Sequence, residues 1–404
     1  MTQFLKRGDP PRAAEARRSQ RDSRSKPWSA LRLFLLLALL LLALAGCSRV
    51  RNPEGWSGGA LTEDMLFIGT RDGNLLALDR ENGQARWKFE LQGTTDRVRA
   101  IYATPAVFES TVYFGGYDGI FYALDLKGDI QWQTEVGGPI VGSPAIADGK
   151  VLFGSSDGNL YAYEVLEDPD PRPTPVWEFK TEGKVWSEPD EENGVVYFGS
   201  LDKWVYAVRL ADGAEVWRFE TGGAVAASPV IAKNRVLVGS FDSTFYAIDA
   251  QTGAEAWRFE DAKSWYWARP LVLEGTVYAP SLDGNLYALD IQTGELRWTF
   301  ETKGPIIGAP AAVLDLLAVP SRDAETKAWQ IALVDPSDGF KVGVCNIEEE
   351  IRTPLASEGD LIYFGARDRS IRAVRVKESG NPDEEWIHFT DRDDPLPRGR
   401  APAC

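Results

Sequence analysis

One phrase occurs eight times along this 404-residue chain and constrains its fold more than any other feature. Each copy has an apolar stretch, a tight turn with an aspartate, a second apolar stretch and, in most copies, a tryptophan. The turn aspartates lie 39 to 46 residues apart: Asp72, Asp118, Asp157, Asp202, Asp242, Asp283, Asp323 and Asp368. A period near 40 residues with short apolar strands is typical of a closed or stacked array of equivalent units.

Each repeat predicts a small four-stranded antiparallel sheet. The second strand precedes the turn, as in residues 195–198, and the third follows it, because the central residues of an Asp-Gly turn tolerate positive φ. The first strand is expected to carry a proline 13 or 14 residues before the turn aspartate; the first repeat has Gly59 there instead. These prolines are Pro105, Pro144, Pro189, Pro229, Pro270, Pro310 and Pro354. Eight such sheets match a β-propeller at the upper end of the usual four to eight blades.

In most repeats a small residue in the third strand accompanies a large residue in the fourth strand. An alanine is expected in the third strand of all eight copies: Ala77, Ala123, Ala162, Ala207, Ala247, Ala288, Ala332 and Ala373. A bulky partner stands near the start of the fourth strand: Trp87, Trp132, Trp177, Trp217, Trp257, Trp298 and Trp386. In the seventh repeat the tryptophan position is Gly343, and four inserted residues precede Ala332. We expect the indole rings to dock neighbouring sheets together, since each buries about 150–250 Å².

The repeat as a whole can be written SPxxxxGxVYxGSxDGxLYALDxxTGxxxW, which residues 228–257 follow almost literally. It resembles the tryptophan-docking repeat of quinoprotein-type (PQQ-like) β-propellers over roughly residues 58–389. The resemblance implies an all-β, eight-bladed propeller with four antiparallel strands per blade. The segment 386–389 predicts that the last blade is completed by its own repeat, whereas a weak first strand at Gly58-Gly59 leaves a swapped strand as the alternative.

The N-terminal region predicts export. Residues 33–46 form an apolar run after several basic residues and end in Leu44-Ala45-Gly46-Cys47. Such a run is short for a spanning helix, which needs about 20 residues, and is typical of a signal-peptide core. Its end resembles the bacterial lipobox, which implies cleavage before Cys47 and lipidation of that cysteine. The expected organisation is a signal peptide (1–46), a linker (47–57), the propeller (58–389) and a disordered tail (390–404).

Charge and composition exclude several classes of function. Removal of residues 1–46 takes away nine Lys or Arg and three Asp or Glu, so the net charge changes from −16 to −22. A chain this acidic repels phosphate backbones, and nucleic-acid binding is not expected. The single histidine, His388, is interpreted as an ordinary strand residue, so neither a Ser-His-Asp triad nor a histidine-ligated metal site can be assembled. Cys345 and Cys404 are either a disulfide pair or two isolated thiols.

Two groups of proteins share this type of repeat. Quinoprotein dehydrogenases hold PQQ over the axis with calcium, a catalytic aspartate and commonly a disulfide of adjacent cysteines, and no adjacent cysteine pair occurs here. The turn aspartates are interpreted as hairpin residues because every repeat has one. A lipobox followed by eight blades is similar to the BamB-like outer-membrane assembly lipoproteins. That resemblance implies a monomeric, cofactor-free, non-enzymatic scaffold that binds envelope proteins, including the β-barrel assembly machinery.

The resemblance also implies a location outside the cytoplasm. In a cell with an outer membrane, the lipid anchor would hold the propeller on that membrane, facing the periplasm. In a cell without one, it would hold the propeller on the outer face of the cytoplasmic membrane.

Departures between repeats indicate candidate binding residues. The residue before the first-strand proline is small in most copies but is Glu188 in one and Arg269 in another. Large or charged neighbours of these positions are Trp186, Trp265, Tyr266, Trp267 and Arg352. Because innermost strands line the axial channel, we expect these residues at its mouth, either as a binding wall or as a plug of side chains that pair with each other. A binding wall would make the chain a small-molecule or carbohydrate sensor, and a PQQ-dependent oxidoreductase is the second alternative.

Two acidic segments stand outside the repeat. Residues 164–176 form a longer, proline-rich connection in the third repeat, which is either a recognition element or a chance insertion. The run Glu348-Glu349-Glu350 is interpreted as a solvated charge cluster.

Overall fold

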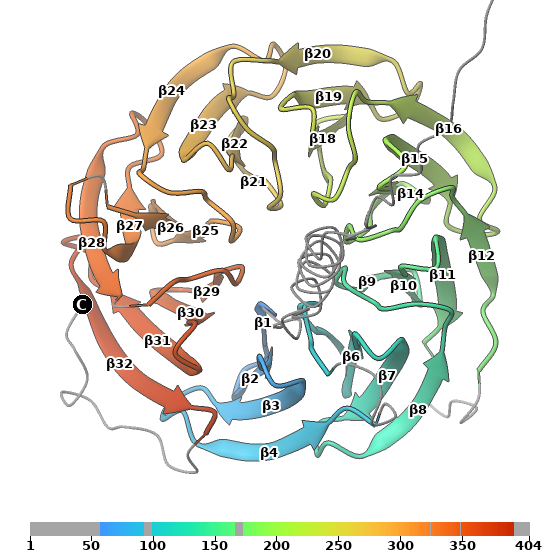
Figure 1. Ribbon diagram of the computed structural model, residues 1–404, viewed down its shortest axis with the longest axis horizontal. Coiled ribbons are helices and arrows are strands. Elements are labelled where there is room, and N and C mark those ends of the chain that lie inside the picture. Colours follow the sequence, from blue (N-terminus) through green and yellow to red (C-terminus); the bar gives the residue numbers. More distant parts are fainter. Residues whose placement is uncertain (1–56, 93–98, 166–172, 324, 348, 392–404) are drawn as a thin grey trace, which may run out of the picture. The chain divides into compact units, whose positions relative to one another are not determined.

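The computed structural model describes residues 57–92, 99–165, 173–323, 325–347 and 349–391, which form eight four-stranded antiparallel sheets around one axis (Figure 1). The predicted eight-bladed β-propeller is confirmed. All regular elements of the described residues are strands, and no described segment forms a helix that is long and apolar enough to cross a membrane.

The first four blades each contain four strands that are consecutive in the chain. Blade 1 contains β1 (Gly59–Leu61), β2 (Met65–Gly69), β3 (Asn74–Asp79) and β4 (Ala85–Glu90). Blade 2 contains β5 (Ala106–Phe108), β6 (Thr111–Gly115), β7 (Ile120–Asp125) and β8 (Ile130–Glu135). Blade 3 contains β9 (Ala145–Ala147), β10 (Lys150–Gly154), β11 (Asn159–Glu164) and β12 (Trp177–Lys180). Blade 4 contains β13 (Asp190–Glu192), β14 (Val195–Gly199), β15 (Trp204–Arg209) and β16 (Glu215–Glu220).

The second half of the ring follows the same plan. Blade 5 contains β17 (Val230–Ala232), β18 (Arg235–Gly239), β19 (Phe245–Asp249) and β20 (Glu255–Phe259). Blade 6 contains β21 (Leu271–Leu273), β22 (Thr276–Pro280), β23 (Asn285–Asp290) and β24 (Leu296–Glu301). Blade 7 contains β25 (Ala311–Val313), β26 (Leu316–Arg322), β27 (Trp329–Val334) and β28 (Lys341–Ile347). Blade 8 contains β29 (Ala356–Glu358), β30 (Leu361–Gly365), β31 (Ser370–Val376) and β32 (Pro382–Phe389).

The ring closes without exchange of a strand. Blade 1 pairs only β1 to β4, and blade 8 pairs only β29 to β32. The Trp386 indole donates a hydrogen bond across the closure to the carbonyl of Arg80, 2.9 Å away. Six of the seven prolines lie immediately before the innermost strands rather than within them, as Pro144 does before β9, and Leu355 separates Pro354 from β29. A residue without an N–H is tolerated there because it opens no gap in the ladder.

The fourth-strand tryptophans connect each blade to the next. In six of them the indole N–H donates to a backbone carbonyl that follows the third strand of the next blade, at 2.8 to 3.0 Å; the six are Trp87, Trp177, Trp217, Trp257, Trp298 and Trp386. Trp132 stacks instead on Tyr163 of blade 3, with 5.7 Å between ring centroids. Six of the seven indoles therefore combine packing of a large apolar ring with a directed hydrogen bond.

A glycine of the next blade lies against the face of the same indole. Gly253, at φ +71°, lies so close to Trp217 that a Cβ would approach the ring atoms to 2.8 Å. Gly294 has the same relation to Trp257, with φ +74° and a Cβ distance of 2.6 Å. Only glycine meets both conditions, because the backbone is left-handed and there is no room for a side chain.

In blade 7 the large residue of the facing pair is in the third strand and the small one is in the fourth. In blade 6 Ala288 lies opposite Trp298, and at the equivalent place in blade 7 Leu333 lies opposite Gly343. Ala332 lies in the third strand of blade 7 as expected, but one position away from the residue equivalent to Ala288, and it packs against blade 6. The strand alternates its faces, so a shift of one residue reverses the side that a residue packs against. The position of Gly343 itself agrees with the sequence, and the carbonyl of Gly380 fills the space that an indole would take.

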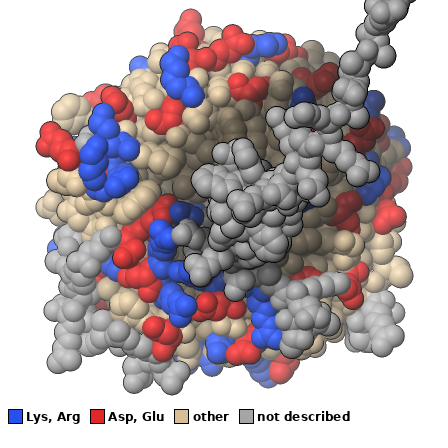
Figure 2. All heavy atoms as spheres, in the orientation of Figure 1, with Lys and Arg blue, Asp and Glu red and all other residues tan. Residues whose placement is uncertain are grey.

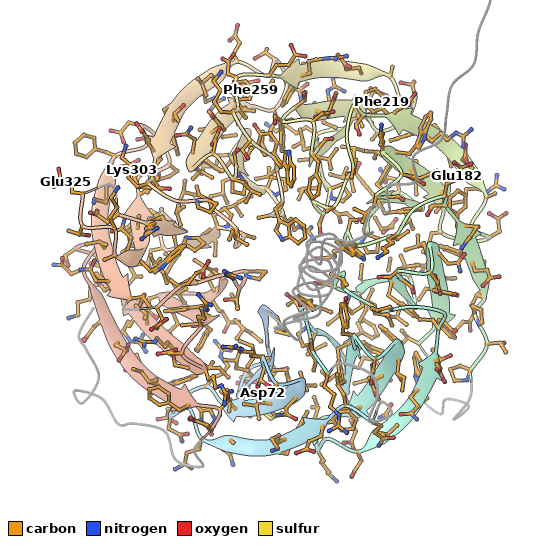
Figure 3. All side chains as sticks on the ribbon, viewed as in Figure 1. Asp72, Glu182, Phe219, Phe259, Lys303 and Glu325 are labelled. Atoms are coloured by element: carbon orange, nitrogen blue, oxygen red, sulfur yellow. The ribbon has the colours of Figure 1, made fainter. Side chains whose placement is uncertain are left out.

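A second contact joins blades near the turn aspartates. In five blades a third-strand tyrosine hydroxyl donates to the turn aspartate at 2.7 to 3.0 Å: Tyr122, Tyr161, Tyr206, Tyr246 and Tyr287. Phe219 and Phe259 of the previous blades, labelled in Figure 3, pack on Tyr246 and Tyr287 at 5.5 and 4.9 Å between ring centroids.

The turn aspartates also accept hydrogen bonds from the previous blade. The Asp242 carboxylate accepts the N–H of Thr244 in its own hairpin and the N–H of Gly222 in the preceding connector. Asp157, Asp202 and Asp283 accept connector N–H groups in the same way. The aspartates thus serve in the hairpin, as the sequence indicated, and additionally join neighbouring blades.

Cys345 is the one cysteine within the described residues. Cys345 of β28 is buried and disulfide-bonded, so it is not an isolated thiol. Cys47 and Cys404 lie outside the described residues, as do the predicted signal peptide and most of the predicted linker and tail. In the longer connection of blade 3, residues 166–172 also lie outside them.

Replacement of one indole should have a large and local effect on stability. We expect Trp217→Phe to lower the free energy of unfolding by about 1–3 kcal/mol, because the hydrogen bond to the Ala250 carbonyl is lost and the ring is smaller. Urea unfolding followed by circular dichroism measures this change. The control is Val216→Ala at the neighbouring exposed position, which should stay within about 0.5 kcal/mol of the wild type; equal losses in both variants would contradict the assigned role of the indole.

Candidate functional site at the axial channel

Two rings of side chains line the axial channel. Both rings come from the residues that precede the innermost strands, and the chain bends at the residue between the two ring positions, as at Ser187. The ring directly before the prolines contributes Thr104, Ser143, Glu188, Ser228, Arg269 and Ala309. The ring two residues earlier contributes Tyr102, Val141, Trp186, Ala226, Trp267 and Ile307. Together with Arg352 and neighbouring residues they surround a cavity of about 360 Å³.

Hydroxyl groups of the first ring connect neighbouring blades. The N–H of Thr104 donates to Ser143 Oγ at 3.0 Å, and the N–H of Glu188 donates to Ser228 Oγ at 2.9 Å. The N–H of Gly58 donates to Thr104 Oγ1 at 3.1 Å. Half of the repeats have a hydroxyl residue here, and in three of them it accepts a backbone N–H of the preceding blade.

Blades 4 and 6 place large side chains where other blades have small ones. Arg269 Nη1 lies 2.5 Å from Glu188 Oε1, and Arg269 Nη2 lies 3.4 Å from Asp190 Oδ2. The two charged side chains meet across the small Ser228 of blade 5. Burial raises the pKa of the Glu188 carboxyl, and the Arg269 guanidinium offsets this increase in part.

An aromatic strip begins at the same place and extends along the connector face. We use this name for Trp186, Trp267, Phe241 and Trp265. The Trp186 and Trp267 rings meet edge to face at 6.4 Å, and Phe241 stacks on Trp267 at 5.8 Å and on Trp265 at 4.8 Å. Trp267 is 37% and Trp265 49% exposed. Exposed neighbouring aromatic rings are typical of a binding surface.

The residues predicted at the channel mouth lie in three different surroundings. Trp186, Glu188, Trp267, Arg269 and Arg352 line one cavity. Trp265 is not among its lining residues and lies outward against Phe241. Tyr266 is buried between blades, where burial raises the pKa of its hydroxyl. Glu188 pairs with Arg269 as in the plug interpretation, yet a cavity remains beside the pair.

Sequence reasoning missed several lining residues and misread one carboxylate. Val141, Ala226 and Ile307 are apolar and carry no chemical signal, but their position two residues before the ring of Thr104 and Ser143 would have identified them. Glu350 is not a solvated charge: its side chain is 12% exposed and lies 2.6 Å from Arg352 Nε.

Other titratable groups do not form a metal site within the described part of the chain. No three His, Cys, Asp or Glu side chains there are placed to hold a metal ion. His388 is buried within β32. On the face seen in Figure 2, acidic and basic side chains are interspersed.

Removal of Arg269 tests the charge arrangement. We expect Arg269→Ser to lower the free energy of unfolding by about 1–3 kcal/mol at pH 7, since two carboxylates lose their partner. The Glu188 pKa in the folded state then rises further above its unfolded value. A raised acid pKa gives stability that is present at low pH and lost as the pH rises through it, so the loss should be smaller at pH 4.

The matched control for this variant is the double substitution Glu188→Ser and Arg269→Ser. It should unfold within about 0.5 kcal/mol of the wild type, because other repeats form the same blade with small residues there. Urea unfolding at pH 4 and pH 7 measures both variants. A double variant as unstable as Arg269→Ser would show that the ion pair is not the source of the loss.

Comparisons with known proteins agree with this architecture. Among solved structures, BamB from Moraxella catarrhalis aligns with a TM-score of 0.66 at 18% identity, over 80% of this chain and 94% of that one. The computationally designed Ika8 protein aligns with a TM-score of 0.66 at 17% identity, over 83% of this chain and 96% of that one. At these identities the likeness shows the fold.

Sequence comparisons show the family. The outer membrane protein assembly factor BamB of Yersinia pestis is 33% identical over 90 residues, which span 21% of this chain and 23% of that protein. The sequence model of the family described as outer membrane protein assembly factor BamB matches residues 26–167 and 201–386, and Trp186 and Glu188 lie in the gap between them. By this match over most of its length, the chain belongs to the family of the outer membrane protein assembly factor BamB.

Proposed function

We propose that this chain is a non-enzymatic, lipid-anchored scaffold that binds envelope proteins through its propeller loops and acts in outer-membrane β-barrel protein assembly. Family membership supports the process, because the matching relative from Yersinia pestis is named as an outer membrane protein assembly factor. The lipobox that ends at Cys47 supports the anchor. In this proposal the protein works as a monomer without a cofactor, outside the cytoplasm and at the outer membrane.

The observation that carries the proposal is the exposed aromatic strip on the connector face. Trp265 and Trp267 remain substantially exposed although the same chain buries its docking tryptophans between blades. Exposed tryptophans in a cluster are typical of energetic centres of protein interfaces. The net charge of −22 after removal of residues 1–46 favours partners with basic surfaces.

Photo-crosslinking in cells tests the docking surface. A photoreactive amino acid at Trp265 should capture an outer-membrane assembly component, because this position lies on the exposed part of the strip. The matched control is Phe340, which is 74% exposed in the β27–β28 turn. Antiparallel strands place that turn on the face opposite the connectors. Immunoblotting of crosslinked envelope fractions gives the result; equal capture from both positions, or none from Trp265, would refute this surface.

The anchor is tested separately through Cys47. Metabolic labelling with radioactive palmitate should mark the wild type, and Cys47→Ala should lose the label and leave the membrane fraction, since the thiol is the predicted site of acylation. Cys345→Ala serves as the control for cysteine loss and should keep the label. Labelling of Cys47→Ala at the wild-type level would rule out the predicted anchor.

A further inference from the structure

The repeats provide an internal reference for the residues that line the axial cavity. Blade 5 forms with Ala226 and Ser228 at the two lining positions, and blade 3 forms with Val141 and Ser143. These four residues are small or apolar. The propeller fold therefore does not require Trp186 and Glu188 in blade 4, or Trp267 and Arg269 in blade 6. Large and charged residues at these positions need another explanation.

The two tryptophans and the two charged residues, Trp186, Trp267, Glu188 and Arg269, form two layers on one side of the cavity. The indoles of Trp186 and Trp267 meet above the small Ala226, and the carboxylate of Glu188 meets the guanidinium of Arg269 across Ser228. Trp186 is held in place by a hydrogen bond of 2.8 Å from its Nε1 to Ser156 Oγ, and Lys184 lies over its ring at 5.3 Å. The aromatic layer and the charged layer both face the same cavity.

The charges of the lining disfavour an ionic ligand. Glu188 is the one carboxylate among the described lining residues, and it is paired with Arg269, so a cation would have to compete with that guanidinium. An anion would have to displace carboxylates, because Arg269 is paired with Glu188 and Asp190, and Arg352 with Glu350. An uncharged ligand avoids both penalties.

Hydrogen-bonding groups of both kinds remain available to such a ligand. Only Oε1 of Glu188 contacts Arg269, so Oε2 can accept from a ligand hydroxyl. Ser143 and Ser228 accept backbone N–H groups, which leaves their own protons free to be donated. Indole faces provide an apolar surface for the C–H side of a sugar ring. Mixed donors and acceptors beside aromatic rings favour a hydroxyl-rich, neutral molecule.

We propose that the axial cavity is a binding site for an uncharged saccharide of one or two rings. Its volume of about 360 Å³ lies within the range of about 300–1,000 Å³ typical of small-molecule sites. Trp186 and Trp267 contact the ring faces, and Glu188 and Arg269 bind the hydroxyl groups. The site is independent of the proposed scaffold function, because ligand binding here requires only the purified chain.

Calorimetric titration of the full-length chain tests this site. The chain is purified in a detergent without a sugar head group, which would otherwise compete for the cavity. The neutral probes are glucose, maltose and N-acetylglucosamine, and the charged analogues are glucosamine and glucuronate. We expect at least one neutral saccharide to bind with a Kd below about 5 mM and both charged analogues to bind at least tenfold more weakly. Failure of all three neutral probes to reach this affinity, or tighter binding of a charged analogue, would overturn the proposal.

Substitutions taken from blade 5 locate the binding. Glu188→Ser and Trp267→Ala introduce the residues that Ser228 and Ala226 already provide in a folded blade, so both variants are expected to keep the fold, which thermal melting checks. Each should weaken saccharide binding at least tenfold. The control is Trp265→Ala, in the same connector but outside the lining, which should change the Kd less than twofold. An equal loss in the control, or unchanged affinity in both lining variants, would place the ligand elsewhere.

Discussion

The bond from an indole N–H to a backbone carbonyl of the next blade is the interaction on which the ring depends. It connects consecutive repeats in both sequence and space, and the glycine that stacks on the indole allows the two chains to approach closely. Because each of these six bonds joins only neighbouring blades, stability is distributed around the ring. The turn aspartates add a second connection nearer the axis, where their carboxylates accept donors from two blades.

Such a framework leaves the connectors free to vary. The tryptophans that dock blades lie in the outer strands, whereas the lining of the axial cavity comes from segments between blades. Glu188 and Trp186 in blade 4 and Arg269 and Trp267 in blade 6 differ from their counterparts without any change in the sheets behind them. A binding surface can therefore evolve on this ring without loss of the contacts that close it.

The sequence predicted the repeat, the blade number and the docking tryptophans because these features recur with constant spacing. It also indicated Glu188 and Arg269, which interrupt a series of small residues. It did not indicate that Trp265 and Trp267 have different surroundings, since these depend on neighbouring blades: Trp265 stacks on Phe241 outside the cavity, whereas Trp267 lines it. The pairing of Glu350 with Arg352 was missed because a run of acidic residues gives no sign of the partner that folding brings to it.

Periodic sequence alone determined the class of fold, the order of the strands and the glycine and tryptophan positions, because every repeat satisfies the same local rules of turn geometry and strand alternation. Tertiary structure decided which of the residues that depart from the repeat pattern come into contact. Glu188 and Arg269 are 81 residues apart, and only the curvature of the ring brings them to 2.5 Å across blade 5. It also decided that Leu333 rather than Ala332 faces Gly343, since the pairing of strands sets which side of a sheet each residue occupies.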